Sequence, residues 1–230
     1  MRDPLFRAKE TMLRKHLAER GITNSRVLEA FRAVPRELFV PPDLSSLAYE
    51  DEPLDIGSGQ TISQPYTVAF MTQLLDPQPT DIVLEVGTGS GYQAAILSRL
   101  CRKVYTIERF EELAKKAAGI LKKLKYDNVS VIVGDGSLGL PGKAPFDGII
   151  ATAGAPKVPE PLIAQLKVGG RLVIPVAVST GLKVALGGIE RVVVPLQEMT
   201  KITKTEKGME KERYPGFRFV PLVGEKGFKG

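Results

Sequence analysis

Two residue types that build many functional centres are nearly absent from this 230-residue chain. It contains one cysteine, Cys101, and one histidine, His16. A single cysteine excludes an intrachain disulfide, and this pair cannot form the Cys/His clusters of the usual zinc sites. We therefore expect no metal centre.

Long apolar runs are also missing. No segment approaches the ~20 residues that a membrane span needs, and residues 1–7 lack the hydrophobic core of a secretory signal. The composition, 43% hydrophobic and 25% charged, is that of an ordinary soluble globular protein. The length fits one domain with appendages, or at most two small domains. These features predict a cytoplasmic protein with no membrane partner.

The net charge of +6 raises the possibility of a nucleic-acid partner, so its position matters. Residues 201–230 hold eight Lys/Arg and four Asp/Glu, a surplus of +4 that leaves only +2 for the first 200 residues. This stretch lacks the alternation of arginine and aromatic residues typical of a nucleic-acid surface. We expect a solvated hairpin or loop there, and no nucleic-acid partner.

The first third of the chain has helical periodicity. Apolar residues recur at helical spacing between Leu5 and Leu17, and Gly21 is a plausible stop. Asn24 or Ser25 can cap a second helix that ends before Pro35. The irregular connection at 41–65 is long for a compact domain, which is often a sign of function.

From Asp81 the pattern changes to alternating strands and helices. Strands are predicted at 82–86, 103–107, 129–133, 146–151 and 171–175. Helices are predicted at 92–100, along a buried stripe within 113–124, and at 160–166, with Gly169-Gly170 turning the chain into the fifth strand. This alternation implies a parallel sheet covered on both faces. Beyond Pro175, β-rich pieces suggest antiparallel strands at one edge.

Glycines follow the first of these strands in the segment Glu85-Val-Gly87-Thr-Gly89-Ser-Gly91. Ligands bind past the carboxyl ends of parallel strands, and glycines let the backbone approach them closely. A dinucleotide loop has the spacing G-x-G-x-x-G and holds a pyrophosphate. Here the spacing is G-x-G-x-G, and Glu85 would repel a pyrophosphate but suits a zwitterionic sulfonium. The pattern resembles the first motif of class I S-adenosylmethionine-dependent methyltransferases.

Two more strand ends agree with such a site. Glu108 ends the second strand, where its carboxylate could accept both ribose hydroxyls, although a surface charge is the alternative. Gly134-Asp135-Gly136 ends the third strand, where Asp135 and nearby amides could meet the adenine edge, although Asp-Gly is also a common turn pair.

The methyl acceptor must be inferred from other segments, because a fold does not specify a reaction. After the fourth strand, residues 151–156 lack the Asn/Asp-Pro-Pro-aromatic tetrad of base N-methyltransferases. The block at 57–65, Gly-Ser-Gly-Gln-Thr-Ile-Ser-Gln-Pro, resembles that of the protein-L-isoaspartate O-methyltransferases. Further matching blocks lie in order at 34–40, 49–51, 84–93, 134–136, 144–147 and 218–222. The stretch 178–209 departs from the pattern, which leaves the edge strands and any roles there open.

The resemblance implies a fold and an activity. The fold is an α/β, doubly wound, mostly parallel Rossmann-like methyltransferase sheet with N-terminal helices and a C-terminal antiparallel β addition. We expect a helical and substrate-loop region at 1–80, a cofactor core at 81–177 and a β-rich extension at 178–230, packed as one compact domain. The implied activity transfers the methyl of S-adenosylmethionine to the free α-carboxylate of L-isoaspartyl residues in proteins and peptides. Activity on D-aspartyl residues and the preferred substrates stay open, and a monomer is expected.

The resemblance also implies site residues. Ser63 is the expected catalytic residue, with a serine in a proline-bounded turn as the alternative. The expected cofactor contacts are Thr61, Ile62, Ser63, Glu85, Gly87, Thr88, Gly89, Gly91, Tyr92, Glu108, Arg109, Gly134, Asp135 and Gly136. The expected substrate contacts are Ser63, Gln64, Val220, Pro221 and Leu222, although core packing explains Phe219 and Leu222 equally well. Rival hypotheses are a class I enzyme with an RNA or small-molecule acceptor and a silent cofactor-binding module.

Overall fold

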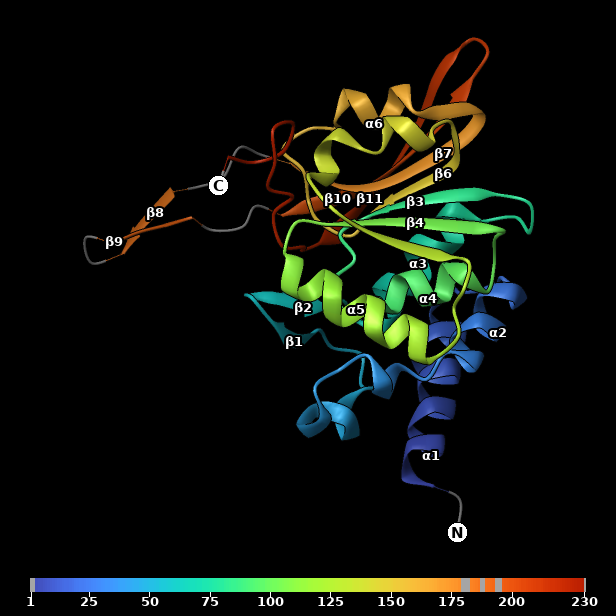
Figure 1. Ribbon diagram of the computed structural model, residues 1–230. Coiled ribbons are helices and arrows are strands. Elements are labelled where there is room, and N and C mark those ends of the chain that lie inside the picture. Colours follow the sequence, from blue (N-terminus) through green and yellow to red (C-terminus); the bar gives the residue numbers. More distant parts are fainter. Residues whose placement is uncertain (1–2, 179–182, 187–188, 193–195, 230) are drawn as a thin grey trace.

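A seven-stranded sheet forms the centre of the protein (Figure 1). The computed structural model describes residues 3–178, 183–186, 189–192 and 196–229. The strand order is β11-β10-β7-β6-β3-β4-β5. The strands are β3 (Ile82–Val86), β4 (Lys103–Glu108), β5 (Val129–Val133), β6 (Phe146–Ala151), β7 (Leu166–Ala177), β10 (Gln197–Thr205) and β11 (Gly208–Phe217). Strands β3 to β7 pair in parallel, and β10 and β11 add antiparallel pairings at one edge. The predicted sheet is confirmed.

Helices cover both faces of this sheet, as expected from the strand–helix alternation. In Figure 1, α6 lies on one side of the sheet and α3, α4 and α5 lie on the other. Neighbouring strand residues point to opposite faces; thus Val83 packs with the N-terminal helices, whereas Leu84 packs with α6. The α-helices are α1 (Pro4–Thr11), α2 (Ser25–Ala33), α3 (Pro65–Leu75), α4 (Tyr92–Ser98), α5 (Glu111–Lys123) and α6 (Glu160–Ala164).

The N-terminal helices follow the sequence signals. Helix α1 continues through a π-helical stretch, Met12–Leu17, and a 3₁₀ turn, Ala18–Arg20. Gly21 ends it with a φ of +93°, a conformation that glycine adopts without strain. The side chain of Asn24 caps α2 by accepting hydrogen bonds from the next helical N–H groups, as predicted.

Three predicted boundaries were wrong by a few residues. Helix α4 ends at Ser98 rather than at residue 100, and α6 ends before Leu166. Leu166 instead pairs with Phe146 of β6, so β7 begins five residues earlier than expected. The glycines expected to lead into this strand lie within it. The position of a Cβ on Gly170 is 2.9 Å from the carbonyl oxygen of Lys167, so this irregular part of β7 needs glycine.

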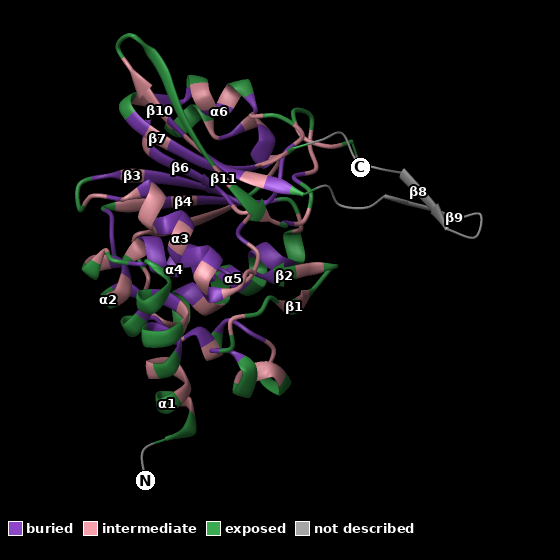
Figure 2. Cartoon of the chain, turned by 180° about the vertical axis from the view of Figure 1, so that it is seen from behind, coloured by how far each residue is buried: buried purple, intermediate pink, exposed green. Residues whose placement is uncertain are grey.

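The first part of the basic C-terminal stretch, up to Phe217, lies in the antiparallel hairpin of β10 and β11. Figure 2 shows β11 largely exposed beside a buried sheet centre. Lys201 lies 2.8 Å from Glu212 of the opposite strand, so part of the charge is paired within the hairpin. Strands β8 (Lys183–Leu186) and β9 (Ile189–Val192) pair separately. The other residues of 179–195 lie outside the described residues.

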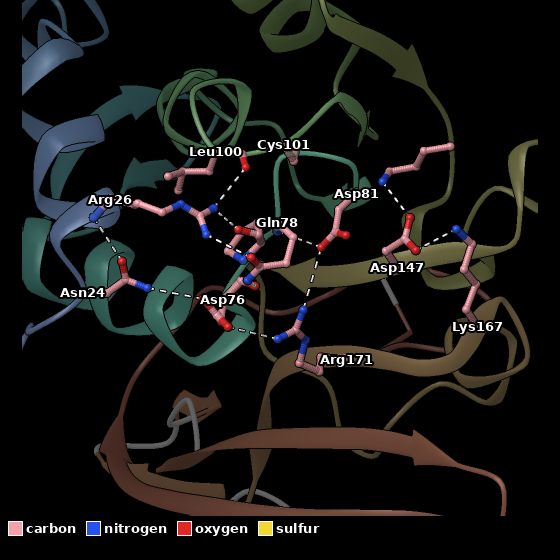
Figure 3. Close-up of polar contacts among 12 residues, drawn as sticks. Asn24, Arg26, Asp76, Gln78, Asp81, Leu100, Cys101, Asp147, Lys167 and Arg171 are labelled. Atoms are coloured by element: carbon pink, nitrogen blue, oxygen red, sulfur yellow. Dashed lines mark hydrogen bonds and ion pairs between the residues drawn. The ribbon is translucent and has the colours of Figure 1, made fainter.

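Polar contacts tie the elements together at the amino ends of the strands (Figure 3). Arg171 of β7 forms ion pairs with Asp76 and Asp81, which flank the turn into β3. Asp147 accepts a hydrogen bond from the backbone N–H of Ile82 and pairs with Lys167 at 2.6 Å. These contacts hold the strands together at their amino ends. The opposite edge of the sheet, at the carboxyl ends of the strands, is not used by them. In the part of the chain that the structure describes, no helix has the length and apolar character to cross a membrane.

Candidate active site

Three connected hollows lie past the carboxyl ends of the parallel strands. An inner cleft of about 190 Å³ is lined by Gln60, Thr61, Val86, Gly87, Gly89, Ile107, Glu108, Arg109, Phe110, Gly136, Thr152, Ala153 and Val220 to Val223. A small cavity of about 40 Å³ adjoins the glycine loop, and an outer cleft of about 630 Å³ lies toward Arg218 and Gln64. Thr61 and Thr152 line all three hollows, so they mark the junction.

The glycine loop approaches the neighbouring strand end closely. Gly87 has a φ of +96°, and a Cβ there would lie 2.4 Å from Oγ1 of Thr152. Gly136 is equally crowded, since a Cβ would lie 2.5 Å from Cγ1 of Val86. Both contacts leave room only for glycine, and they bring the backbones of three strand ends to one edge of the inner cleft.

Glu108 lies where the sequence predicts a ribose-binding carboxylate. One of its oxygens accepts a hydrogen bond of 2.8 Å from the N–H of Gly89, and the other accepts one of 3.0 Å from Phe110. A carboxylate has about four lone-pair sites, so two acceptor positions are left for a ligand. The bond to Gly89 also fixes the loop against β4.

Glu85 is a buried carboxylate without a partner. It is fully buried in the small cavity's wall, and neither oxygen has a hydrogen-bond partner among the described residues. Burial raises its pKa to about 8; the nearby hydroxyl of Thr106 opposes this shift, and the charge of Glu108 adds to it. Burying an unpaired carboxylate is costly, whereas a cationic ligand beside the loop would compensate it. The site therefore fits a positively charged group next to Gly87 and Gly89.

Ser63 lies in the connection between the β1–β2 hairpin and α3. Strand β1 (Leu54–Gly57) pairs with β2 (Gln60–Ile62), and Pro65 begins α3. Ser63 lines both the small cavity and the outer cleft. This places Ser63 between the glycine loop and the more open hollow.

The other residues predicted on the hairpin and the C-terminal segment lie around the same junction. Ile62 lines the small cavity and Gln64 the outer cleft, where its side-chain amide donates to Asp51. Val220 and Pro221 line both clefts, and Leu222 lines the inner one. Phe219 and Leu222 are also buried core residues, so the packing alternative for them holds as well.

The predicted loop residues fall into two groups. Thr88 and Tyr92 line the small cavity, and Arg109 lines the inner cleft. Gly91 does not line these hollows; it caps α4 with a φ of +88°.

Gly134 and Asp135 do not line the hollows either. The carboxylate of Asp135 accepts hydrogen bonds from the backbone and hydroxyl of Ser137 and from the N–H of Glu225. Burial opposes ionisation there, but these bonds lower the pKa of Asp135 below its ordinary value. Its carboxylate thus holds the C-terminal segment, whose residues wall the inner cleft, and the cofactor contact expected at Asp135 stays a prediction.

Sequence reasoning assigned no role to several residues of the site. Thr152 follows β6 and donates to the carbonyl of Gly87 at 2.6 Å. Because Thr152 directly follows the strand that pairs with β3, the sequence could have predicted that it lies beside the glycine loop. Gln60 and Phe110 line the inner cleft. Arg36, in a matching block, reaches the carbonyl of Ser63, a contact with no local sequence signal.

Comparisons with known proteins agree over nearly the whole chain. A 50% identical relative from Pelobacter propionicus, protein-L-isoaspartate O-methyltransferase 2, aligns over 96% of this chain and 92% of its own length. A 46% identical protein-L-isoaspartate O-methyltransferase from Methanoculleus marisnigri aligns over 99% of this chain and 97% of its own.

Solved structures support the same relationship. A protein-L-isoaspartate O-methyltransferase structure superposes with a TM-score of 0.79 at 28% identity, covering 95% of this chain and 67% of that one. A Plasmodium falciparum structure, described as a protein-L-isoaspartate O-methyltransferase in complex with S-adenosyl-L-homocysteine, superposes with a TM-score of 0.75 at 25% identity, covering 93% of this chain and 97% of that one. The sequence model of one family matches residues 7–227. The chain belongs to the protein-L-isoaspartate (D-aspartate) O-methyltransferase family.

Proposed function

We propose that this protein performs its family's reaction at the junction of the three hollows. The reaction transfers a methyl group from S-adenosylmethionine to the free α-carboxylate of an L-isoaspartyl residue, giving a methyl ester and S-adenosylhomocysteine. The inner cleft and small cavity hold the methyl donor, and the outer cleft holds the damaged peptide. The observation that carries the proposal is that Ser63 borders both the glycine-loop cavity and the outer cleft.

The residues around the inner side suit the donor. The unpartnered carboxylate of Glu85 complements a cationic amino acid group, and Glu108 retains acceptor positions for ribose hydroxyls. Ile107 and Phe110 provide apolar surface for a base. When bound, S-adenosylmethionine supplies an electrophilic methyl group on its sulfonium.

On the acceptor side, the chain needs no general base. A carboxylate is already ionised near neutral pH, because its reference pKa is about 3.5–4. The Ser63 hydroxyl donates a hydrogen bond to one carboxylate oxygen and leaves the other oxygen directed at the methyl group. The remaining contribution is placement and exclusion of water, which can supply several kcal/mol in well-oriented reactions.

The C-terminal segment, residues 218–222, recognises the peptide through its own backbone, but few of its backbone groups are free to do so. The backbone N–H and carbonyl of Phe219 are bonded to the side-chain amide of Gln197. The carbonyl of Val220 accepts a hydrogen bond from the N–H of Gly154, and the N–H of Leu222 donates to the carbonyl of Gly154. Pro221 has no N–H, so its carbonyl is the group that can accept a bond from a bound peptide. Arg218, which lines the outer cleft, attracts a substrate that carries a carboxylate.

The remaining predictions concern partners and location. We predict no nucleic-acid partner, and the ion pairs Lys201–Glu212 and Arg213–Glu198 support this prediction because they offset part of the positive charge of the hairpin. A monomer in the cytoplasm remains our prediction from the sequence.

The direct test is methylation of a synthetic isoaspartyl peptide, with its normal aspartyl twin as the control. We expect incorporation of labelled methyl groups into the first peptide only, and we expect mild alkali to release the label because it is an ester. Equal labelling of both peptides would contradict isoaspartyl recognition. Label that survives alkali would contradict carboxyl methylation.

A further inference from the structure

Arg36 is a fully buried cation near the proposed reaction site. It begins the 3₁₀ turn Arg36–Leu38 and has no exposed surface. Within the part of the chain that the structure describes, its guanidinium pairs with no carboxylate. Burial lowers the pKa of Arg36 from its ordinary value, which expresses the cost of holding a charge there. An apolar side chain of similar length would fill the space without that cost.

The donors of Arg36 reach two irregular stretches of backbone. Its Nε donates to the carbonyl of Ala48 at 2.7 Å, and its Nη2 donates to the carbonyl of Ser63 at 2.8 Å. Hydrogen bonds from a charged donor to a buried carbonyl are stronger than neutral ones. Among the described residues, the third nitrogen, Nη1, has no hydrogen-bond partner. The two carbonyls thus set the orientation of the guanidinium, although not all of its N–H groups are hydrogen-bonded.

The same guanidinium lies over the ring of Tyr92, with its central carbon 4.7 Å from the ring centre. Tyr92 is the first residue of α4, directly after the glycine loop, and its ring also contacts Phe31 and Phe39 edge-on. Arg36 therefore joins the Ser63 connection to the helix that follows the donor-binding loop. The stacking is a cation–π contact, which strengthens when water is excluded.

We propose that Arg36 is a positioning residue, which holds the Ser63 backbone at a fixed place relative to the glycine loop so that the hydroxyl meets the acceptor carboxylate. The inference rests on the proposed function of Ser63. Ser63 is held on one side by β2 and on the other by Pro65, and the bond from Arg36 fixes the carbonyl between them. Freeing that carbonyl lets the peptide plane rotate and moves the hydroxyl away from the line between the two substrates.

Two substitutions separate positioning from simple core filling. Arg36→Met retains the length but removes every donor, and Arg36→Lys retains a charge that can reach one carbonyl at a time. Arg26→Met is the matched control. Arg26 also donates to backbone carbonyls, those of Pro77 and Leu100, but it lies at the amino ends of the strands (Figure 3).

The experiment measures turnover, donor affinity and thermal stability for each variant of the full chain. We expect Arg36→Met to lower kcat by at least about 30-fold while the S-adenosylmethionine Kd changes less than about threefold, and Arg36→Lys to be intermediate. Arg26→Met should lose stability and keep kcat. Unchanged kcat in folded Arg36→Met would overturn the proposal, as would unchanged kcat in Arg36→Lys if the methionine variant does not fold.

A double substitution links the effect to Ser63. If Arg36 acts through the hydroxyl, adding Arg36→Lys to Ser63→Ala lowers kcat no further. If the kcat of the double variant falls by the product of the two single losses, the positioning role of Arg36 is overturned, but the proposed role of Ser63 is not. An unaffected Ser63→Ala variant would instead contradict the proposed function of Ser63, and an inactive wild-type protein would contradict the reaction itself. These outcomes are distinguishable in one data set.

Discussion

The hydroxyl of Thr152 donates a hydrogen bond of 2.6 Å to the carbonyl oxygen of Gly87. This contact joins the end of β6 to the start of the glycine loop, and it depends on the missing side chain of Gly87. A Cβ would meet Oγ1 at 2.4 Å but Thr152 Cβ only at 3.7 Å, so the hydroxyl is the obstacle.

Gly87→Ala should therefore destabilise the protein and weaken donor binding. The positive φ alone costs about 1–2 kcal/mol for a residue with a side chain, and the clash adds to it. In the double mutant Gly87→Ala/Thr152→Ala, the part of the stability loss that comes from the clash should be regained. It should not be regained in Gly87→Ala/Thr152→Ser, because serine retains the hydroxyl. Thermal unfolding and calorimetric Kd measurements check both variants; equal behaviour of the two double mutants would contradict this account.

Ser63→Ala should reduce turnover while donor binding is largely kept. A hydrogen bond to a charged group is worth about 1.5–3 kcal/mol, so kcat should fall about 10- to 100-fold. Ser58→Gly is the matched control, because Ser58 lies in the exposed turn of the same hairpin with a φ of 54°. If calorimetry shows that Ser63→Ala mainly loses donor affinity, the hydroxyl has a structural or binding role instead.

Donor affinity should depend on pH through Glu85. Its pKa is about 8 in the free protein, and a cationic ligand favours the ionised form, so binding releases a proton at lower pH. Affinity should rise with pH up to about 8, by at most tenfold per pH unit, and then level off. Glu85→Gln should bind more weakly at pH 8.5 and lose this component of the pH profile. Calorimetry across pH 6–9 measures the donor Kd of the wild type and of Glu85→Gln. The ligand ionises identically in both series, so the difference between them reports Glu85.

Glu85 also predicts the pH dependence of stability in the free protein. Its folded pKa lies above its unfolded value, so its favourable contribution is present in acid and is lost as pH rises toward 8. Above that pH a buried charge remains in the folded state. Glu85→Gln should therefore raise Tm relative to wild type more at pH 9 than at pH 5; the reverse order would contradict the burial of an unpaired carboxylate.

Asp135→Asn should loosen the C-terminal segment. An amide in place of the carboxylate loses acceptor positions for Ser137 and Glu225, and each lost bond costs about 0.5–1.5 kcal/mol. Trypsin should then cleave after Lys226 several times faster than in wild type. Asp127→Asn, at an exposed position, is the control. Equal cleavage rates would show that Asp135 does not secure this segment.

Cys101 should be unreactive in the folded protein. It is buried, its thiol donates to the carbonyl of Leu97, and burial raises its pKa to about 12. The thiolate is the reactive form of cysteine, and the raised pKa makes it scarce at pH 8. A chromogenic disulfide reagent should titrate one thiol after unfolding and almost none before. Rapid labelling of the native protein would contradict this burial.

The sequence predicted the central fold well because its signals are local. Val83 and Leu84 belong to a short β-branched run between turn signals, and such runs in alternation with helices specify a parallel sheet. The boundaries around Gly170 were wrong because they depend on pairing with Phe146, a contact across the sheet. Local propensity carries no information on that register.

In the site, too, features that follow from local sequence could be predicted, and contacts between distant segments could not. The positions of Gly87, Glu108 and Thr152 follow from strand ends, which parallel topology brings to one edge. The partners of Asp135 and Arg36 could not be predicted, because Glu225 is 90 residues from Asp135 and Ser63 is 27 from Arg36. Such contacts are set by tertiary packing, not by spacing along the chain.

The hydrogen bonds of Asp135 and Asp147 bear on ageing of the protein itself. The chain contains two Asp-Gly pairs, Asp135-Gly136 and Asp147-Gly148, and this dipeptide forms a succinimide readily when the following amide nitrogen can attack the side-chain carboxyl. One carboxylate is held by Ser137 and Glu225, and the other by Ile82 and Lys167. Although burial opposes ionisation, these contacts hold the pKa of both carboxyls below its ordinary value, and an ionised carboxylate is a poor electrophile for the attacking amide. We therefore expect both pairs to convert to isoaspartate more slowly in the folded protein than in the unfolded chain.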